Sequence, residues 1–341
     1  MKRWQKIVLF TALLLGVVVS VGITATVGWR PIIGPRARTL TERTFDPTPA
    51  RLARGAYLLN AVTPCLVCHS EPATNAVFLP KPGMEGAGRS WKADGMPWLV
   101  APNITPDRET GAGDWSDDAI ARAIREGIGH DGRALFPMMP YKHFRQMSDE
   151  DLASVVSYLR TIRPVRQPRP TSTVPFPVSH FINNEPEPID APIPEPDLST
   201  PEKRGKYLTT LGVCSECHSP IDDRGQLVPG MDFGGGNTLT FEGKPSAAAA
   251  NLTPSPNGIP YYTEGLFLET IRTGHVRERA LSDLMPWVFF KNMTDEDLKS
   301  IFAYLKTLTP VDHYVDNALP PSNCARCGLQ HGGGARNKKV S

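Results

Sequence analysis

The sequence lacks a surplus of charge of either sign. Lysine and arginine total 37 residues and aspartate and glutamate total 35, so the net charge is only +2. A protein that binds nucleic acid needs a basic surplus to neutralise phosphates. We therefore expect no nucleic acid among the partners. A protein partner stays open, because local charged patches can lie within a neutral total.

The sequence also lacks cysteines outside short paired motifs. Its six cysteines form three Cys-x-x-Cys pairs, which are Cys65/Cys68, Cys214/Cys217 and Cys324/Cys327. His69 and His218 follow the first two pairs immediately, whereas Gly328 follows the third. Complete pairing is not typical of scattered structural cysteines. It indicates attachment chemistry, metal binding or redox chemistry.

A long uncharged run lies near the N-terminus, from Ile7 to Trp29, after three basic residues within the first six. As a helix, its 23 residues would span about 34 Å, enough to cross a hydrocarbon core of about 30 Å. Trp4 and Trp29 flank the run, as is typical of membrane interfaces. We expect residues 1–30 to form an uncleaved single-pass anchor. The alternative is a cleaved signal peptide, although its best cleavage site is weak.

An internal repeat organises the rest of the chain. Five landmarks recur about 146–150 residues later. They are Arg54-Gly55 with Arg204-Gly205, Cys65 with Cys214, Asn103 with Asn251, Met139-Pro140 with Met285-Pro286, and Met147 with Met293. The nearly constant offset predicts duplicated domains at residues 47–165 and 198–312. Between them, residues 166–197 are expected to form a Pro-rich linker, and residues 313–341 form a tail.

Both units are predicted to be helical, giving an all-α fold of two tandem domains after the N-terminal helix. Thr48-Pro49 and Thr200-Pro201 each place an N-cap before a proline at the first helical position. A second helix is expected from about Asp117 to Gly127. We find no convincing run of alternating strand residues.

The last helix of each unit carries the clearest pattern. Ser148 and Thr294 are expected N-caps, and Pro164 and Pro310 are expected to end the two helices. The apolar positions follow the i, i+3, i+4, i+7 spacing of one buried stripe. They are Leu152, Val155, Val156 and Leu159 in the first unit, and Leu298, Ile301, Phe302 and Leu305 in the second.

Cys-x-x-Cys-His is the attachment signature of c-type haem. The two thiols form thioethers with the haem vinyl groups, and the adjacent histidine reaches the iron. A zinc site would need four ligands, normally from two pairs within one small module. Here the two pairs lie about 149 residues apart. The sequence therefore predicts two covalently attached haem c groups, held by Cys65, Cys68 and His69, and by Cys214, Cys217 and His218.

Met139 and Met285 are the expected sixth ligands of the two irons. Both precede a proline, and thioether sulfur suits haem iron. Met138 has no counterpart in the second unit, where the position holds Leu284, so it is expected to pack. The rival ligands are two histidines. His130 lies 9 residues before Met139, and His275 lies 10 residues before Met285.

These motifs resemble a known family. Asn103-Ile-Thr-Pro, Gly132-Arg133, Met139-Pro-Tyr and Met147-Ser-Asp-Glu-Asp are similar to the cytochrome c subunits of bacterial membrane-bound dehydrogenases, within the class I cytochrome c family. The resemblance covers about residues 47–165 and 198–312. It implies two small helical haem domains with the axial pairs His69/Met139 and His218/Met285. The N-terminal anchor, with its basic end inside, predicts a bacterial inner-membrane protein with its haem domains in the periplasm.

Iron that is closed on both faces favours one-electron transfer, because no position is open for a substrate. We expect an electron carrier, not an enzyme by itself. It would relay electrons between a dehydrogenase or other donor and a soluble cytochrome or terminal oxidase. The main alternative is a dihaem peroxidase, which needs one open or releasable iron position. A structural zinc protein is a third, weaker hypothesis.

The third cysteine pair has a different interpretation. Cys324 and Cys327 lack the adjacent histidine, so no third haem is predicted. His331 lies four residues beyond Cys327, but two cysteines and one histidine leave a zinc site without a fourth ligand. In an oxidising compartment the pair therefore favours a small disulfide loop over a zinc site.

Overall fold

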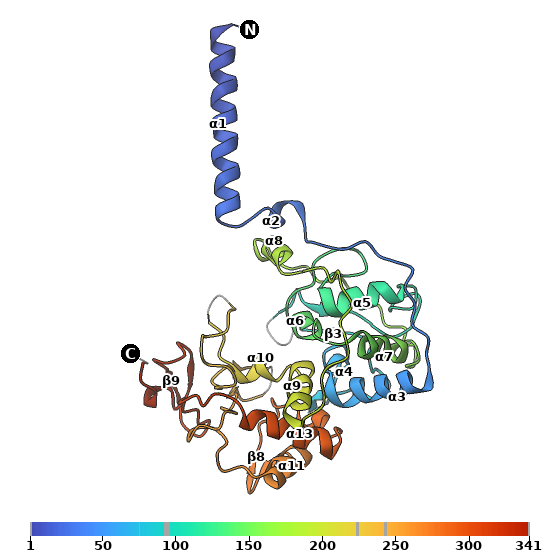
Figure 1. The fold of residues 1–341 in the computed structure, drawn as a ribbon, viewed down its shortest axis with the longest axis vertical. Coiled ribbons are helices and arrows are strands. Elements are labelled where there is room, and N and C mark those ends of the chain that lie inside the picture. Colours follow the sequence, from blue (N-terminus) through green and yellow to red (C-terminus); the bar gives the residue numbers. More distant parts are fainter. Residues whose placement is uncertain (1, 75, 92–95, 223–224, 242–243, 340–341) are drawn as a thin grey trace.

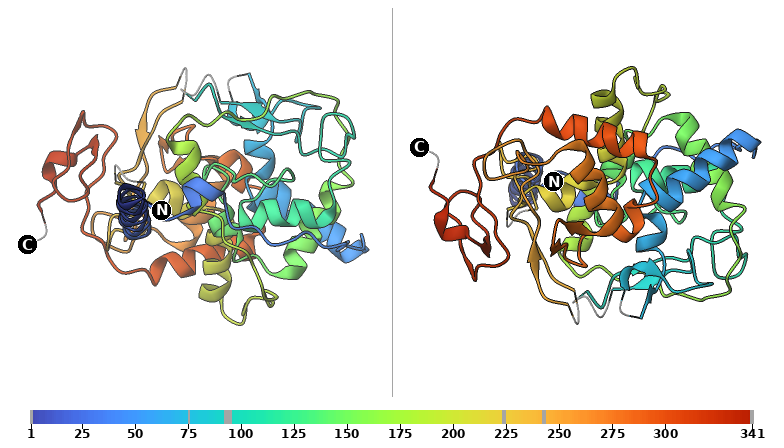
Figure 2. Two further views of the ribbon diagram at one scale, coloured as in Figure 1. Left: turned by 90° about the horizontal axis from the view of Figure 1, so that it is seen from above. Right: turned by 90° about the horizontal axis from the view of Figure 1, so that it is seen from below.

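A computed structural model describes residues 2–74, 76–91, 96–222, 225–241 and 244–339. The N-terminal helix α1 (Arg3–Ala25) projects away from a body that holds the other helices (Figure 1). Seen along α1, the C-terminal tail lies at one edge of that body, on the side away from the first unit (Figure 2). The chain is mainly helical, as expected.

Helix α1 is apolar and does not pack into the body of the protein. An 18-residue window of the helix has a mean hydropathy of 2.6, and none of the helix residues is buried. The helix ends at Ala25, so the expectation of one helix through to Trp29 is wrong. Gly28 adopts a positive φ of 71°, and the Trp29 indole turns back to donate to the Thr24 hydroxyl at 3.1 Å. The helix instead takes up Arg3–Lys6 at its start, so it keeps a length of 23 residues.

The two units contain corresponding α-helices in the same order, and the first also contains a π-helical turn. The first contains α3 (Pro49–Tyr57), the π-helical turn η1 (Leu58–Val62), α4 (Cys65–Cys68), α5 (Asp117–Glu126), α6 (Tyr141–Phe144) and α7 (Asp149–Leu159). The second contains α9 (Pro201–Leu211), α10 (Cys214–His218), α11 (Glu264–Thr273), α12 (Trp287–Phe290) and α13 (Asp295–Lys306). The first and last helices of each unit cross closely. At Gly55 an added Cβ would lie 2.1 Å from the Ser154 carbonyl oxygen, and at Gly205 it would lie 1.9 Å from that of Ser300.

The predicted helix starts are confirmed. The hydroxyls of Thr48 and Thr200 accept from backbone amides three residues on, and Ser148 and Thr294 do the same for the last helices. The apolar stripes of α7 and α13 face the core, and Phe302 packs against it while partly buried. Pro164 and Pro310 do not set the helix ends, since α7 ends at Leu159 and α13 at Lys306.

The structure also contains short antiparallel strand pairs. The sequence analysis did not predict these strands. They are β1 (Pro72–Ala73) with β2 (Ala76–Pro80), β3 (Arg89–Ser90) with β4 (Val100–Ala101), β5 (Thr238–Leu239) with β6 (Ala247–Ala248), β7 (His275–Val276) with β8 (Arg279–Ala280), and β9 (Pro321–Asn323) with β10 (Gln330–Gly332). None is longer than five residues, which is too short for an alternating pattern to emerge.

The segment between the units is less extended than predicted. It contains α8 (Val178–Phe181) and η2 (Ile182–Asn184), and the short helix α2 (Arg30–Ile33) lies against both (Figure 1). Its first part follows the surface of the first unit. There the Ser172 hydroxyl accepts from the Val100 amide at 2.9 Å. The prolines therefore direct this segment along the protein surface without keeping it wholly irregular.

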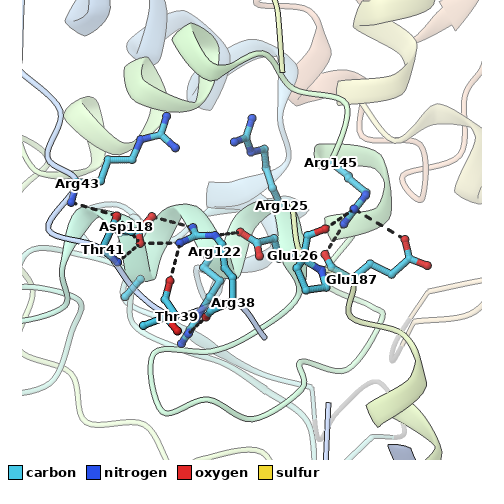
Figure 3. A network of polar contacts seen from close by, with 12 residues as sticks. Arg38, Thr39, Thr41, Arg43, Asp118, Arg122, Arg125, Glu126, Arg145 and Glu187 are labelled. Carbon is cyan, nitrogen blue, oxygen red and sulfur yellow. Dashed lines mark hydrogen bonds and ion pairs between the residues drawn. The ribbon is translucent and has the colours of Figure 1, made fainter. Parts of the chain in front are cut away.

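Residues 34–46, which we call the strap, cross the first unit before α3. Arg38 lies between two buried carboxylates of α5 and contacts Asp118 at 2.7 Å and Glu126 at 2.8 Å (Figure 3). The Thr41 amide also donates to Asp118 at 2.7 Å. The strap thereby ties the end of the α1–α2 segment to the body.

The two units meet through a reciprocal pair of tyrosines. Tyr207 of the second unit donates to Asp151 of α7 at 2.8 Å, and it accepts from the Ser148 amide at 3.2 Å. Tyr57 of the first unit donates to Asp297 of α13 in the same way. Each tyrosine thus reaches the start of the last helix of the other unit, so the interface is approximately two-fold symmetric.

Candidate haem and metal sites

The first two cysteine pairs lie on one-turn helices. Cys65 and Cys68 bound α4, and Cys214 and Cys217 lie on α10. His69 follows α4 directly, and its Nδ1 donates to the Pro102 carbonyl at 2.8 Å. His218 makes the matching bond to the Ala250 carbonyl, also at 2.8 Å. Because Nδ1 holds the ring proton, Nε2 of each neutral imidazole keeps the lone pair that a metal ligand needs.

A backbone frame fixes both histidines. The His69 carbonyl accepts from the Gly88 amide at 2.7 Å, and the His218 carbonyl accepts from the Gly235 amide at the same distance. Both glycines have positive φ, 85° and 74°. An added Cβ would lie 2.8 Å from the Ala101 carbonyl oxygen in the first frame. Only glycine fits this crossing, which explains two glycines that the sequence analysis did not single out.

The repeated Asn-x-Thr motif completes each frame. The Asn103 side-chain oxygen accepts from the Thr105 hydroxyl at 2.7 Å, and its amide donates to the Val165 carbonyl at 2.8 Å. Asn251 makes the same contacts with Thr253 and Val311, at the same distances. Each buried asparagine thereby joins the loop that orients the histidine to the chain leaving the last helix. The repeat marked these residues, but their role required the structure.

Burial keeps the attachment groups neutral. It raises the pKa of Cys68 and Cys214 to about 12 and that of Cys217 to about 11. It also lowers the pKa of His69 and His218, which holds the imidazoles in their metal-binding form. A smaller contribution to the raised pKa of Cys68 comes from Cys217.

The structure separates the candidate sixth ligands. Met139 and Met285 are half-buried against the core, each at a Met-Pro turn before α6 or α12. Met138 is exposed. His130 is also exposed and stacks on Trp115, with ring centroids 4.1 Å apart. The second rival, His275, is likewise exposed, so the burial pattern favours the methionines; axial ligation stays a prediction.

The ligand-bearing segments also touch across the interface. Glu216, between Cys214 and Cys217, contacts His143 of α6 at 2.6 Å. In the other direction, the side-chain amide of Asn292 in the second unit donates to the Asn60 backbone carbonyl of η1 at 3.1 Å. The segment that follows each candidate axial methionine therefore lies against the other unit.

The tail changes the interpretation of the third cysteine pair. His313, Cys324, Cys327 and His331 are all buried, and their ligand atoms lie within 4.8 Å of one another. The expectation that a fourth ligand is missing is therefore wrong. His313 lies 11 residues before Cys324, outside the motif, so spacing gave no signal for it. Both cysteines are free thiols in this structure.

Comparison with known proteins agrees with these motifs. The family described as Cytochrome c matches residues 52–163. A nicotinate dehydrogenase subunit of Pseudomonas putida is 30% identical over 305 residues, which cover 85% of this chain and 24% of that protein. The gluconate 2-dehydrogenase cytochrome c subunit of Pantoea cypripedii is 29% identical over 77% of this chain and 60% of its own length.

A shorter relative, a diheme cytochrome c-type protein of Cereibacter sphaeroides, is 27% identical over 73% of this chain and 83% of its own length. The chain thus spans about a quarter of the first relative and about three fifths of the second. The resemblance noted from the motifs is confirmed. The family match covers the first unit, and the second unit repeats the attachment motif in a matching frame, so the chain is similar to cytochrome c proteins in both units.

Proposed function

We propose that this chain is a dihaem electron-transfer subunit. Cys65 and Cys68 hold one haem c and Cys214 and Cys217 hold the other, with His69 and His218 as axial ligands. The observation that carries the proposal is the duplicated frame. In both units an imidazole next to a Cys-x-x-Cys turn is fixed through Nδ1 by a carbonyl 2.8 Å away.

A bound haem supplies reversible one-electron chemistry, and the chain supplies its surroundings. The frames orient each imidazole, and the core around η1 and α7 excludes water. Met139 and Met285 are the sixth ligands in this proposal, because both are half-buried beside the core. With both iron faces closed, the chain transfers electrons and does not bind a substrate at iron.

The arrangement of the units supports transfer from one haem to the other. The Glu216–His143 contact joins the second attachment turn to the segment after Met139. In the reverse direction, the Asn292 side chain, after Met285, donates to the Asn60 carbonyl of η1 at 3.1 Å. Electrons entering at one unit would leave from the other without the chain having to rearrange.

The relatives support a role within a larger complex. Two of them are named as subunits of dehydrogenases. In our proposal, a dehydrogenase partner donates electrons and a soluble cytochrome or terminal oxidase accepts them. Helix α1 anchors the chain in the bacterial inner membrane, with both haem units in the periplasm. No other element in the described residues is long and apolar enough to span a bilayer.

Covalent haem counting tests the proposal. Mass spectrometry after acid–acetone extraction should show two haem additions, because thioethers survive extraction. Cys214→Ala combined with Cys217→Ala should leave one addition, whereas Ser215→Ala on the same turn should leave two. A wild-type chain with one addition, or with none, would contradict the assignment.

A further inference from the structure

The C-terminal tail brings four metal-binding side chains to one buried point. His313 and His331 are 0% and 1% exposed, and Cys324 and Cys327 are 3% and 5% exposed. The two cysteines lie in the loop between β9 and β10, and His331 lies on β10 opposite Ser322. His313 comes from the segment that leaves the second unit. None of the four residues belongs to either haem attachment motif, and the functions proposed for those motifs do not use them.

The distances suit a tetrahedral ion. His313 Nε2 lies 3.1 Å from His331 Nε2 and 3.3 Å from Cys324 Sγ. Zinc bonds of about 2.0–2.1 Å to nitrogen and about 2.3 Å to sulfur place tetrahedral ligand atoms roughly 3.3–3.8 Å apart. The four side chains therefore need only small shifts to close on one ion.

The ring orientations give an independent argument. His313 Nδ1 lies 2.8 Å from the Gly234 carbonyl oxygen, and His331 Nδ1 lies 3.1 Å from that of Gly332. A carbonyl can only accept, so in the neutral rings each Nδ1 carries the proton. The two Nε2 lone pairs then face each other across 3.1 Å, an arrangement that repels unless a cation binds both.

The geometry points to a structural zinc site formed by His313, Cys324, Cys327 and His331. Mixed thiolate and imidazole ligands in tetrahedral array are typical of Zn²⁺. The Cys327 backbone amide donates toward Cys324 Sγ at 3.4 Å, so the loop itself positions this sulfur. Four protein ligands leave no open position, so the ion holds structure and performs no catalysis. A disulfide would use the two sulfurs and would leave the converging imidazoles unexplained.

The site would fasten the tail to the second haem frame. His313 is held through Gly234, beside the Gly235 amide that bonds the His218 carbonyl. The His313 carbonyl also accepts from the Asn251 side chain at 3.0 Å. An added Cβ at Gly236 would lie 2.6 Å from the His313 ring, so the fit is close. Zinc therefore completes the support of the loops around His218.

Metal analysis of the full-length, haem-loaded protein tests the site. Protein purified without chelators should contain one zinc ion per chain by plasma mass spectrometry. Thiol alkylation of the denatured protein without reductant should label both Cys324 and Cys327. Cys324→Ser and His313→Asn should each lose the zinc, while His180→Asn, at an exposed histidine of α8, should keep it.

Two outcomes would overturn the site. One is zinc-free wild-type protein whose Cys324 and Cys327 resist alkylation until reduced, which identifies a disulfide. The other is full zinc retention in His313→Asn. If a variant does not fold, chelator treatment of the wild type decides, because loss of zinc should speed tryptic cleavage at Arg326 and Arg336. Unchanged cleavage after zinc removal would contradict a fastening role.

Discussion

At the residue scale, one side chain often decides between two chemistries. Met138 and Met139 are adjacent methionines that differ mainly in how far each side chain is buried. Met138 is 38% exposed, whereas Met139 packs against the core. The repeat had selected the same residue, since only the second methionine recurs. The repeat and the burial therefore both favour Met139 over Met138 as the axial ligand.

Replacing the proposed axial methionine should change one haem. Met139→Ala should abolish the methionine-to-ferric-iron charge-transfer band of one haem and lower its reduction potential, because a thioether favours ferrous iron. Met138→Leu should leave spectrum and potential nearly unchanged, since the two side chains have similar volume. Potentiometric titration with optical detection measures both. Loss of the axial ligand in His130→Gln, but not in Met139→Ala, would show that this haem has two histidine ligands.

At the element scale, Arg38 makes the most buried ion pairs of the strap. Asp118 and Glu126 are 1% and 3% exposed, and Arg38 lies between them (Figure 3). Burial alone would raise the pKa of Asp118, yet hydrogen bonds from Arg38 and Thr41 hold it below its usual value. The strap is thus attached by a charge pair with little access to water.

Removing that cation should destabilise the first unit. Arg38→Ala leaves two buried carboxylates without their partner, which should lower the free energy of unfolding by about 3–5 kcal/mol. Arg43→Ala should cost under about 1 kcal/mol, because its pair with Asp149 is 3.8 Å long and about one third exposed. Guanidinium chloride unfolding measures both. Equal losses in the two variants would contradict the role of the strap.

The same variant should alter the pH dependence of stability. A carboxylate whose folded pKa is depressed adds stability above its unfolded pKa, about 3.9, and loses it as pH falls through the folded value. Wild-type stability should therefore drop below about pH 4. In Arg38→Ala, burial would raise the pKa of Asp118. The loss of folding stability that protonation of Asp118 causes at acidic pH should therefore disappear. Unfolding curves at several acidic pH values make the comparison.

Helix α1 is a second element with its own prediction. Its exposed apolar surface has no partner within the chain, so it should hold the protein in the membrane through a carbonate wash. A variant lacking residues 3–25 but supplied with a cleavable export signal should be released as soluble protein. N-terminal sequencing of the natural protein shows whether the segment is retained or cleaved. A mature chain that starts near Thr26 would show a cleaved signal instead.

At the scale of the whole molecule, reciprocal contacts join the two units. Tyr57 and Tyr207 each bond a buried aspartate of the other unit, and the same aspartates pair with Arg204 and Arg54 of their own units. Each aspartate therefore serves both the packing of its own unit and the interface. This shared use should make the units unfold together.

Removing the two hydroxyls tests that coupling. Tyr57→Phe combined with Tyr207→Phe should lower the unfolding free energy by about 1.5–3 kcal/mol per bond, because each bond is made to a buried carboxylate. It should also separate one calorimetric transition into two. Tyr158→Phe is the matched control, since its hydroxyl makes a 3.4 Å contact with exposed Asn60. A single transition in the double variant would show that other contacts join the units.

The sequence by itself determined what depends on local spacing. Two Cys-x-x-Cys-His motifs indicate haem because the attachment chemistry fixes that spacing. Helix starts followed from Thr48, Thr200, Ser148 and Thr294, because an N-cap acts on amides within three residues. Duplication was visible because its landmarks keep their order. All of these signals lie within a few residues or repeat at one offset.

Only the tertiary structure decided which distant residues meet. His313 joins the tail cysteines because the chain folds back after the second unit, and no spacing records that return. The strap, the crossed tyrosines and the glycines that bond the carbonyls of His69 and His218 depend on the chain path in the same way. Their neighbours in space come from segments far apart in sequence. The path of the chain, set by core packing, therefore determined the fourth ligand and the interface.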